Sequence, residues 1–103
     1  MKLTGKAKGM FTDFLYSKMM LEGHSVFRFW AQFSKLPESM QWGVYQDFAD
    51  SLGLELYVDK NTPISFGWGL FDLLKEINGG YLSTRQEARN AAIEKLNEII
   101  NEK

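Results

Sequence analysis

The apolar positions in the centre of the chain follow the spacing of a helix that is covered on two sides. Within the segment 36–53, two adjoining strips of apolar residues recur at helical spacing: Met40, Val44, Phe48 and Leu52, and beside them Trp42, Tyr45 and Ala49. Pro37 suits the first helical turn, where a missing N–H has no partner to lose, and Gly53 suits the left-handed position just beyond the end. The pattern therefore predicts a central helix that ends at Gly53.

Two helical segments are expected before this one. Residues 5–22 predict a helix with a cap at Thr4 and a single apolar face, made by Ala7, Met10, Phe11, Phe14, Leu15 and Met19. The aromatic run VFRFWAQF, residues 26–33, predicts a short helix that Ser25 would cap, although so aromatic a run could also form a strand. The N-terminal half is thus expected to be helical.

After Gly53 the hydrophobic period changes from a helical one to two. Residues 54–59 place apolar side chains on one side and Glu55, Tyr57 and Asp59 on the other, which is typical of a half-buried strand. Turn residues follow at 60–63, and a second strand is expected from the alternation of Ile64, Phe66, Trp68 and Leu70 with Ser65, Gly67 and Gly69. Glycine weakens a strand, so the glycine side of this strand is expected to be packed closely by a helix of the chain or by another molecule.

The segment 71–77 admits two interpretations. It could be a helix that ends at Asn78-Gly79, or extended structure in which Asn78-Gly79 forms a hairpin turn. We favour the extended form, with residues 80–82 returning as a short third strand. A last helix is then predicted from a capping box, Thr84 to Glu87, and from an apolar face that runs to about residue 100.

These elements predict a single α+β domain over residues 1–103: a helical N-terminal half and a small antiparallel sheet of two to three strands, packed by the central and C-terminal helices. The chain has 103 residues, of which 45% are hydrophobic and 15% aromatic, enough for one core. It contains no cysteine, which excludes thiol catalysis, cysteine-type zinc sites and disulfides. Because no run of about 18 apolar residues occurs, we expect a cytoplasmic protein with no membrane partner.

The sequence offers little catalytic chemistry. No nucleophile motif, phosphate-binding loop, zinc-binding helix motif or dinucleotide fingerprint occurs. His24 is the sole histidine, and no other metal-ligand type clusters around it, so a turn or cap role is favoured over metal binding or general-base catalysis. We therefore expect a protein that is not an enzyme and needs no cofactor or metal.

Charge is distributed unevenly along the chain. Residues 1–35 carry six basic and two acidic side chains, residues 36–79 two basic and seven acidic, and residues 80–103 four of each, although the formal net charge is only −1. Such polarity can orient a partner, and a solvated surface is the ordinary alternative. The candidate partner-binding residues are Asp47, Asp50, Glu55, Asp59, Trp68, Arg85 and Arg89.

Three segments carry a family resemblance: LTGKAK (3–8), LPESMQWGVYQDFADSLG (36–53) and STRQEARNAAIEKLNEIIN (83–101). They resemble a group of small phage and mobile-element proteins of Bacteroidetes-type bacteria. The resemblance implies an accessory protein that binds host machinery, and inhibitors of RNA-guided CRISPR effectors are one such class. On this interpretation the partner is a host defence protein, and the acidic residues would occupy its basic nucleic-acid channel, or the aromatic and glycine surface near Trp68 would dock on it.

The order of elements from residue 37 onward is also similar to the double-stranded-RNA-binding domain, whose last helix opens with a basic pattern followed by alanines. RQEARNAA would then place Arg85 and Arg89 at phosphate-contacting positions. Gln86 stands where a second basic residue is expected, and the acidic charge of residues 36–79 opposes an RNA surface. RNA binding is therefore the alternative, and a structural role, for instance in a phage particle, is a third.

Overall fold

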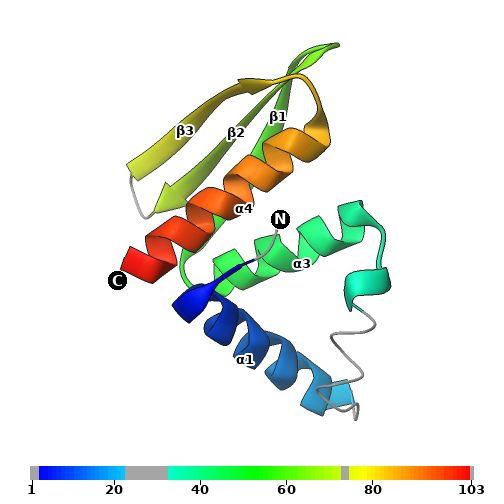
Figure 1. Cartoon of the computed structure of the whole chain (residues 1–103), viewed down its shortest axis with the longest axis vertical. Coiled ribbons are helices and arrows are strands. Elements are labelled where there is room, and N and C mark those ends of the chain that lie inside the picture. Colours follow the sequence, from blue (N-terminus) through cyan, green and yellow to red (C-terminus); the bar gives the residue numbers. More distant parts are fainter. Residues whose placement is uncertain (1–2, 23–32, 73–74, 103) are drawn as a thin grey trace.

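The computed structural model describes residues 3–22, 33–72 and 75–102. Its helices and strands are α1 (Gly5–Glu22), α3 (Glu38–Ser51), β1 (Leu54–Thr62), β2 (Ser65–Asp72), β3 (Lys75–Leu82) and α4 (Arg85–Glu102) (Figure 1). The predicted α+β class is confirmed. Of the predicted aromatic helix, only Phe33 is described, and it lies in a short helical stretch, residues 33–35; Ser25 and His24 lie outside the described residues.

The three strands form an antiparallel sheet in the order β1-β2-β3. The extended form of residues 75–77 is confirmed, but the predicted turn at Asn78-Gly79 is wrong, because both residues lie inside β3. Gly79 instead allows a close approach, since a side chain there would overlap the indole of Trp68. Ile64 was expected to share the apolar side of the second strand with Phe66, Trp68 and Leu70, but it lies in the turn before β2 and is 79% exposed.

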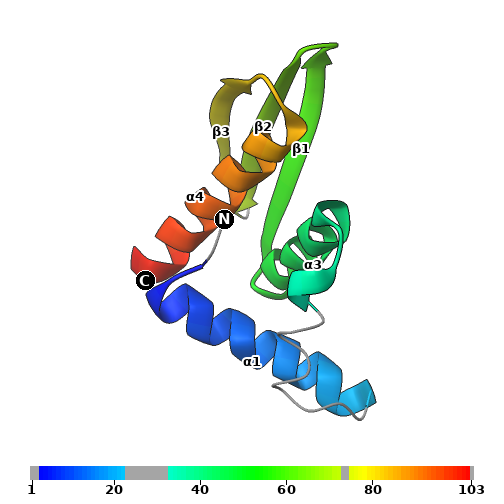
Figure 2. The same cartoon turned by 45° about the vertical axis from the view of Figure 1, so that its right-hand side comes forward.

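The helices cover one face of this sheet. Helix α4 packs on all three strands, α3 packs on β1 and on α4, and α1 packs on α4 (Figures 1 and 2). No described helix covers the opposite face. The sheet is therefore packed on one side and open on the other.

The core is one cluster that extends from the covered face of the sheet and α4 to α3 and α1. Phe11 of α1 is fully buried, and its ring centroid lies 4.8 Å from that of Tyr45 and 5.1 Å from that of Phe48, both on α3. The predicted strip that starts at Met40 is wrong at its first position, since Met40 is 58% exposed. The elements described around α3 pack against the side that carries Trp42, Tyr45, Phe48 and Ala49, so Met40 faces solvent.

The residues predicted to end α3 and to cap α3 and α4 can be compared with the structure. Gly53 has a φ of 77°, as its predicted left-handed position requires, whereas Pro37 stands at the N-cap and not in the first turn. The Glu87 N–H donates to Thr84 Oγ1 at 3.1 Å, which confirms one half of the capping box. The other half differs, because the Glu87 carboxylate accepts from the hydroxyls of Thr84 and Ser83 at 2.9 and 3.0 Å, not from a backbone N–H.

The start of α1 is held by α4 and not by the predicted Thr4 side-chain cap. The Thr4 N–H donates to Asn97 Oδ1 at 2.8 Å, and the Ala7 N–H donates to Asn101 Oδ1 at 3.0 Å. The Thr4 hydroxyl accepts from Asn97 Nδ2 at 3.2 Å. Two asparagines of the C-terminal helix thus satisfy N–H groups that a helix start leaves without intrahelical partners.

Candidate protein-binding surface

The central strand contributes few side chains to the open face of the sheet. Strand β2 directs Phe66, Trp68 and Leu70 toward α4, where Leu70 is fully buried and Trp68 packs against the core. Gly67 and Gly69 occupy alternate positions, on the other face. Because these glycines have no side chains, the space above β2 is filled from the two edge strands.

Tyr57 of β1 lies across Gly69. A Cβ on Gly69 would overlap the Tyr57 phenol, so the ring lies directly on the backbone of β2. Its hydroxyl reaches β3, where it is within hydrogen-bonding distance of the Glu76 carboxylate and the Asn78 side chain. Burial, followed by the hydrogen bond to Glu76 and the negative charges of Glu76 and Asp59, raises the pKa of Tyr57 to about 12.

Tyr81 of β3 lies across Gly67 in the same way, from the opposite edge. A Cβ on Gly67 would stand 3.0 Å from Cε1 of Tyr81, yet Tyr81 remains 66% exposed. The ring of Phe71 lies beside that of Tyr57, with centroids 5.5 Å apart and an interplanar angle of 36°. These three rings, Tyr57, Phe71 and Tyr81, form an aromatic platform on the open face.

Strand pairing arranges this face in three rows across the sheet. Read from β1 through β2 to β3, the first row is Glu55, Phe71 and Glu76, and the second is Tyr57, Gly69 and Asn78. The third row is Asp59, Gly67 and Tyr81. Neighbouring strands lie about 4.8 Å apart, so the members of a row are lateral neighbours. Each of the two outer rows therefore contains an aromatic ring and at least one carboxylate.

The open face carries negative charge only. Glu55, Asp59 and Glu76 are exposed there, and among the described strand residues no lysine or arginine occupies an outward position. Lys60 pairs with Phe66 and Lys75 with Asp72, which places both lysines on the side of the helices. We call the surface made by the platform and these carboxylates the acidic aromatic face: Glu55, Tyr57, Asp59, Phe71, Glu76 and Tyr81.

The predicted acidic residues divide between two elements. Glu55 and Asp59 lie beside the platform, whereas Asp47 and Asp50 are exposed on α3, on the side away from its buried residues. Trp68 lies on the opposite face of the sheet, half-buried, with its indole over Gly79. The glycine surface and Trp68 were expected together, but the structure places them on different faces.

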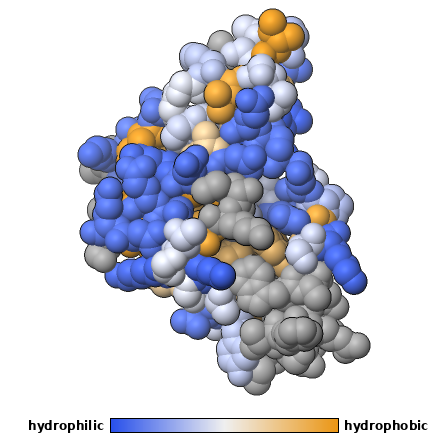
Figure 3. All heavy atoms as spheres, viewed as in Figure 1, coloured by the Kyte–Doolittle hydropathy of each residue, from blue (hydrophilic) through white to orange (hydrophobic). Residues whose placement is uncertain are grey.

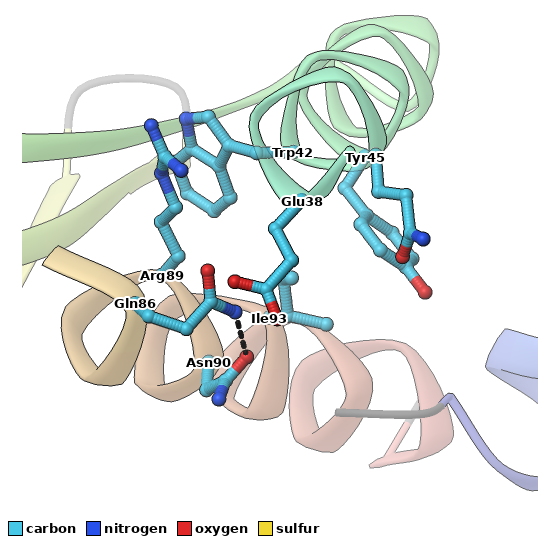
Figure 4. Close-up of a pocket in the computed structure, with 8 residues that line it drawn as sticks. Glu38, Trp42, Tyr45, Gln86, Arg89, Asn90 and Ile93 are labelled. Carbon is cyan, nitrogen blue, oxygen red and sulfur yellow. Dashed lines mark hydrogen bonds between the residues drawn. The ribbon is translucent and has the colours of Figure 1, made fainter. Parts of the chain in front are cut away.

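The two predicted arginines are not presented as a pair. The Arg85 guanidinium lies 5.2 Å from the ring centroid of Phe66, at the end of the sheet. Arg89 is half-buried and lines a pocket together with Trp42 of α3 (Figure 4). Their four-residue spacing on one helix therefore does not produce a shared binding position.

Arg89 borders a small pocket between α3 and α4, of about 70 Å³. Its lining residues are Glu38, Gln41, Trp42, Tyr45, Gln86, Arg89, Asn90 and Ile93 (Figure 4). Gln86 Nε2 donates to Asn90 Oδ1 at 3.0 Å, and the buried Nε of Arg89 has no hydrogen-bond partner. A pocket of this size admits a few water molecules and is far smaller than an ordinary substrate site.

The remaining described surface adds no other candidate site. Seen from the side of α4, the space-filling view is mostly hydrophilic, with scattered hydrophobic residues (Figure 3). Within residues 3–22, 33–72 and 75–102, no three histidine, cysteine or carboxylate side chains are grouped as metal ligands would be. No helix in the described part of the chain has the length and apolar character to cross a membrane.

Sequence reasoning found part of the acidic aromatic face. The period-two pattern placed Glu55, Tyr57 and Asp59 on one side of a strand, and the glycines indicated close packing above β2. Phe71 was missed because the segment 71–77 could be a helix or extended structure, and Glu76 and Tyr81 were missed because the position of the third strand depends on its register with β2. No protein-family model, curated protein or solved structure matches the chain.

Proposed function

We propose that this chain is a non-enzymatic inhibitor that binds a basic surface of a host protein with its acidic aromatic face. The observation that carries the proposal is the composition of that face, three aromatic rings and three carboxylates with no outward basic side chain on the described strands. Complementary charge steers association and discriminates between partners. Tyrosine is enriched among the residues that dominate binding energy at protein interfaces.

The proposed partner is a host defence protein, and an RNA-guided CRISPR effector is the leading specific candidate. The resemblance of segments 36–53 and 83–101 to mobile-element proteins supports this setting. Such an effector holds its nucleic acids in a positively charged channel. The acidic aromatic face would compete with nucleic acid for that channel, which requires no catalytic group on this chain.

The first experiment identifies the partner. Tagged chain is incubated with a Bacteroidetes-type lysate with and without nuclease, and the captured proteins are identified by mass spectrometry. A defence protein that remains bound after nuclease treatment is the expected result. Capture that depends entirely on RNA would contradict the proposal.

The second experiment tests the surface with the purified effector, loaded with its guide RNA, in a DNA-cleavage assay. The double variant Glu55→Lys/Asp59→Lys is expected to lose inhibition, because it reverses two charges beside the platform. The control Asp47→Lys/Asp50→Lys makes the same change of charge on α3 and is expected to inhibit. Inhibition by the wild-type chain should weaken as salt is raised. If the sheet variant inhibits as well as the wild type, the proposed surface is wrong.

Binding of double-stranded RNA is the second candidate, and one observation favours it. The order α3, β1, β2, β3, α4 matches the element order on which the resemblance to the RNA-binding domain rests. Arg85 and Arg89 are its proposed phosphate contacts, although Arg85 lies over the ring of Phe66 and Arg89 is half-buried at a pocket between α3 and α4. A gel shift of duplex RNA by the pure chain, lost in Arg85→Glu/Arg89→Glu, would favour this function over the inhibitor.

A further inference from the structure

We infer that the acidic aromatic face recognises arginine side chains of its partner, whose guanidinium groups stack on the exposed rings of the platform while the neighbouring carboxylates pair with them. This inference rests on the proposed function and specifies the chemistry that the same surface recognises. It requires aromatic rings on the open face and carboxylates that lie beside them.

The two tyrosine rings lie over glycines. The phenol of Tyr57 lies over Gly69, and Cε1 and Cδ1 of Tyr81 lie over Gly67, while Tyr81 stays 66% exposed. Because the glycines have no side chains, they make room for both rings on the open face. A guanidinium is planar, stays charged and stacks on aromatic faces, whereas a lysine ammonium is a compact and strongly hydrated point charge.

Carboxylates lie beside these rings in the same rows. Phe71 has Glu55 on one side and Glu76 on the other, and Asp59 lies in the row of Tyr81 with only Gly67 between them. A carboxylate accepts two parallel N–H bonds from one guanidinium, which fixes the plane of that group. The row of Asp59, Gly67 and Tyr81 therefore offers an arginine a ring to stack on and a carboxylate to pair with.

Alternative occupants fit less well. The three carboxylates of the face repel the phosphates of a nucleic acid. A second copy of this chain could meet the face with the basic side of α1, but the basic side chains of that helix are lysines, and Arg85 of α4 already lies over the ring of Phe66. An arginine-bearing segment of another protein satisfies both the charge and the flat rings.

The test measures binding of the full chain to two homopeptides of equal length and charge, one of arginine and one of lysine. The wild-type chain is expected to bind the arginine peptide about tenfold more tightly, because a planar guanidinium stacks on aromatic rings and pairs with a carboxylate through two parallel N–H bonds, which a lysine ammonium cannot do. Tyr81→Leu keeps the charge and removes a ring, so it should weaken arginine binding several-fold and leave lysine binding unchanged. Tyr81→Phe keeps the ring and should retain the preference.

The control variant is Tyr16→Leu, which removes an exposed tyrosine on α1, away from the sheet. Equal affinity for the two peptides, binding of neither, or an unchanged preference in Tyr81→Leu would each overturn the inference. Self-association that Tyr81→Leu abolishes would also overturn it, since the occupant would then be a second copy.

The two proposals can fail separately. If Glu55→Lys/Asp59→Lys abolishes inhibition while the peptides bind equally, the surface is correct and arginine recognition is wrong. If the arginine preference depends on Tyr81 while the chain inhibits no defence protein, arginine recognition is supported and the inhibitor function is wrong.

Discussion

Gly69 is the position at which one added methyl group tests the arrangement of the open face. Gly69→Ala would place a Cβ where the Tyr57 phenol lies, and the ring would have to leave the backbone of β2. The Tyr57 hydroxyl would then lose its contacts with Glu76 and Asn78. The substitution therefore removes the central ring of the platform without touching a charge.

The change that Gly69→Ala makes in the free energy of unfolding is the sum of two opposing contributions. Loss of the hydrogen bonds of Tyr57 costs about 1–2 kcal/mol, since they are partly exposed to solvent. Alanine in a strand is favoured over glycine by about 0.5–1 kcal/mol. We expect a net loss of about 1 kcal/mol in the free energy of unfolding, or about 4–8 °C in Tm for a domain of this size.

A double-mutant cycle separates these terms in urea unfolding followed by tryptophan fluorescence. In the background Tyr57→Ala the overlap is absent, so Gly69→Ala should become neutral or stabilising, which gives a coupling of about 1–2 kcal/mol. Gly80→Ala is the control, because nothing lies within 4 Å of its added Cβ. If Gly69→Ala has the same effect in both backgrounds, Tyr57 does not lie over Gly69 and the platform is wrong.

Three further predictions address the helix ends and the titration of the face. Thr84→Ala should lower the free energy of unfolding by about 1 kcal/mol in the same urea assay, because the Glu87 N–H loses its acceptor. Asn101→Ala should speed hydrogen exchange of the Ala7 amide, seen by NMR, since that N–H donates to Asn101. Because the pKa of Tyr57 is raised, the stability that its neutral hydroxyl contributes is present below about pH 10 and is lost as pH rises toward about 12. Glu76→Gln should lower this pKa, as measured in a tyrosinate absorbance titration.

The parts of the fold that could be predicted are those with local causes. The ends of α3 and α4 follow from Gly53 and Thr84, whose effects act within one turn of helix. Asn78-Gly79 was misassigned because glycine serves a hairpin turn and a close approach equally well. The indole of Trp68 decides between them, and its position depends on pairing between strands, which no local pattern encodes.

The same distinction explains the candidate surface. Glu55 and Asp59 share a face with Tyr57 on a single strand, so alternation alone was sufficient to group them. Glu76 and Tyr81 join that face only through the β2–β3 register, which shifts between Gly67 and Gly69. The shift leaves Gly79 and Gly80 opposite Trp68, and without it Tyr81 and Leu82 would exchange faces relative to Glu76.

The glycines of the central strand connect the stability of the sheet with its proposed recognition. Each costs about 0.5–1 kcal/mol relative to alanine, and β-branched side chains at Gly67 and Gly69 would suit a strand better. Such side chains would displace the rings of Tyr57 and Tyr81 that lie over these glycines. The glycines that lower the stability of β2 are thus the residues that make room for the two rings. Gly69→Ala should consequently weaken arginine-peptide binding as well as the fold, whereas Gly80→Ala should change neither binding nor the arginine preference.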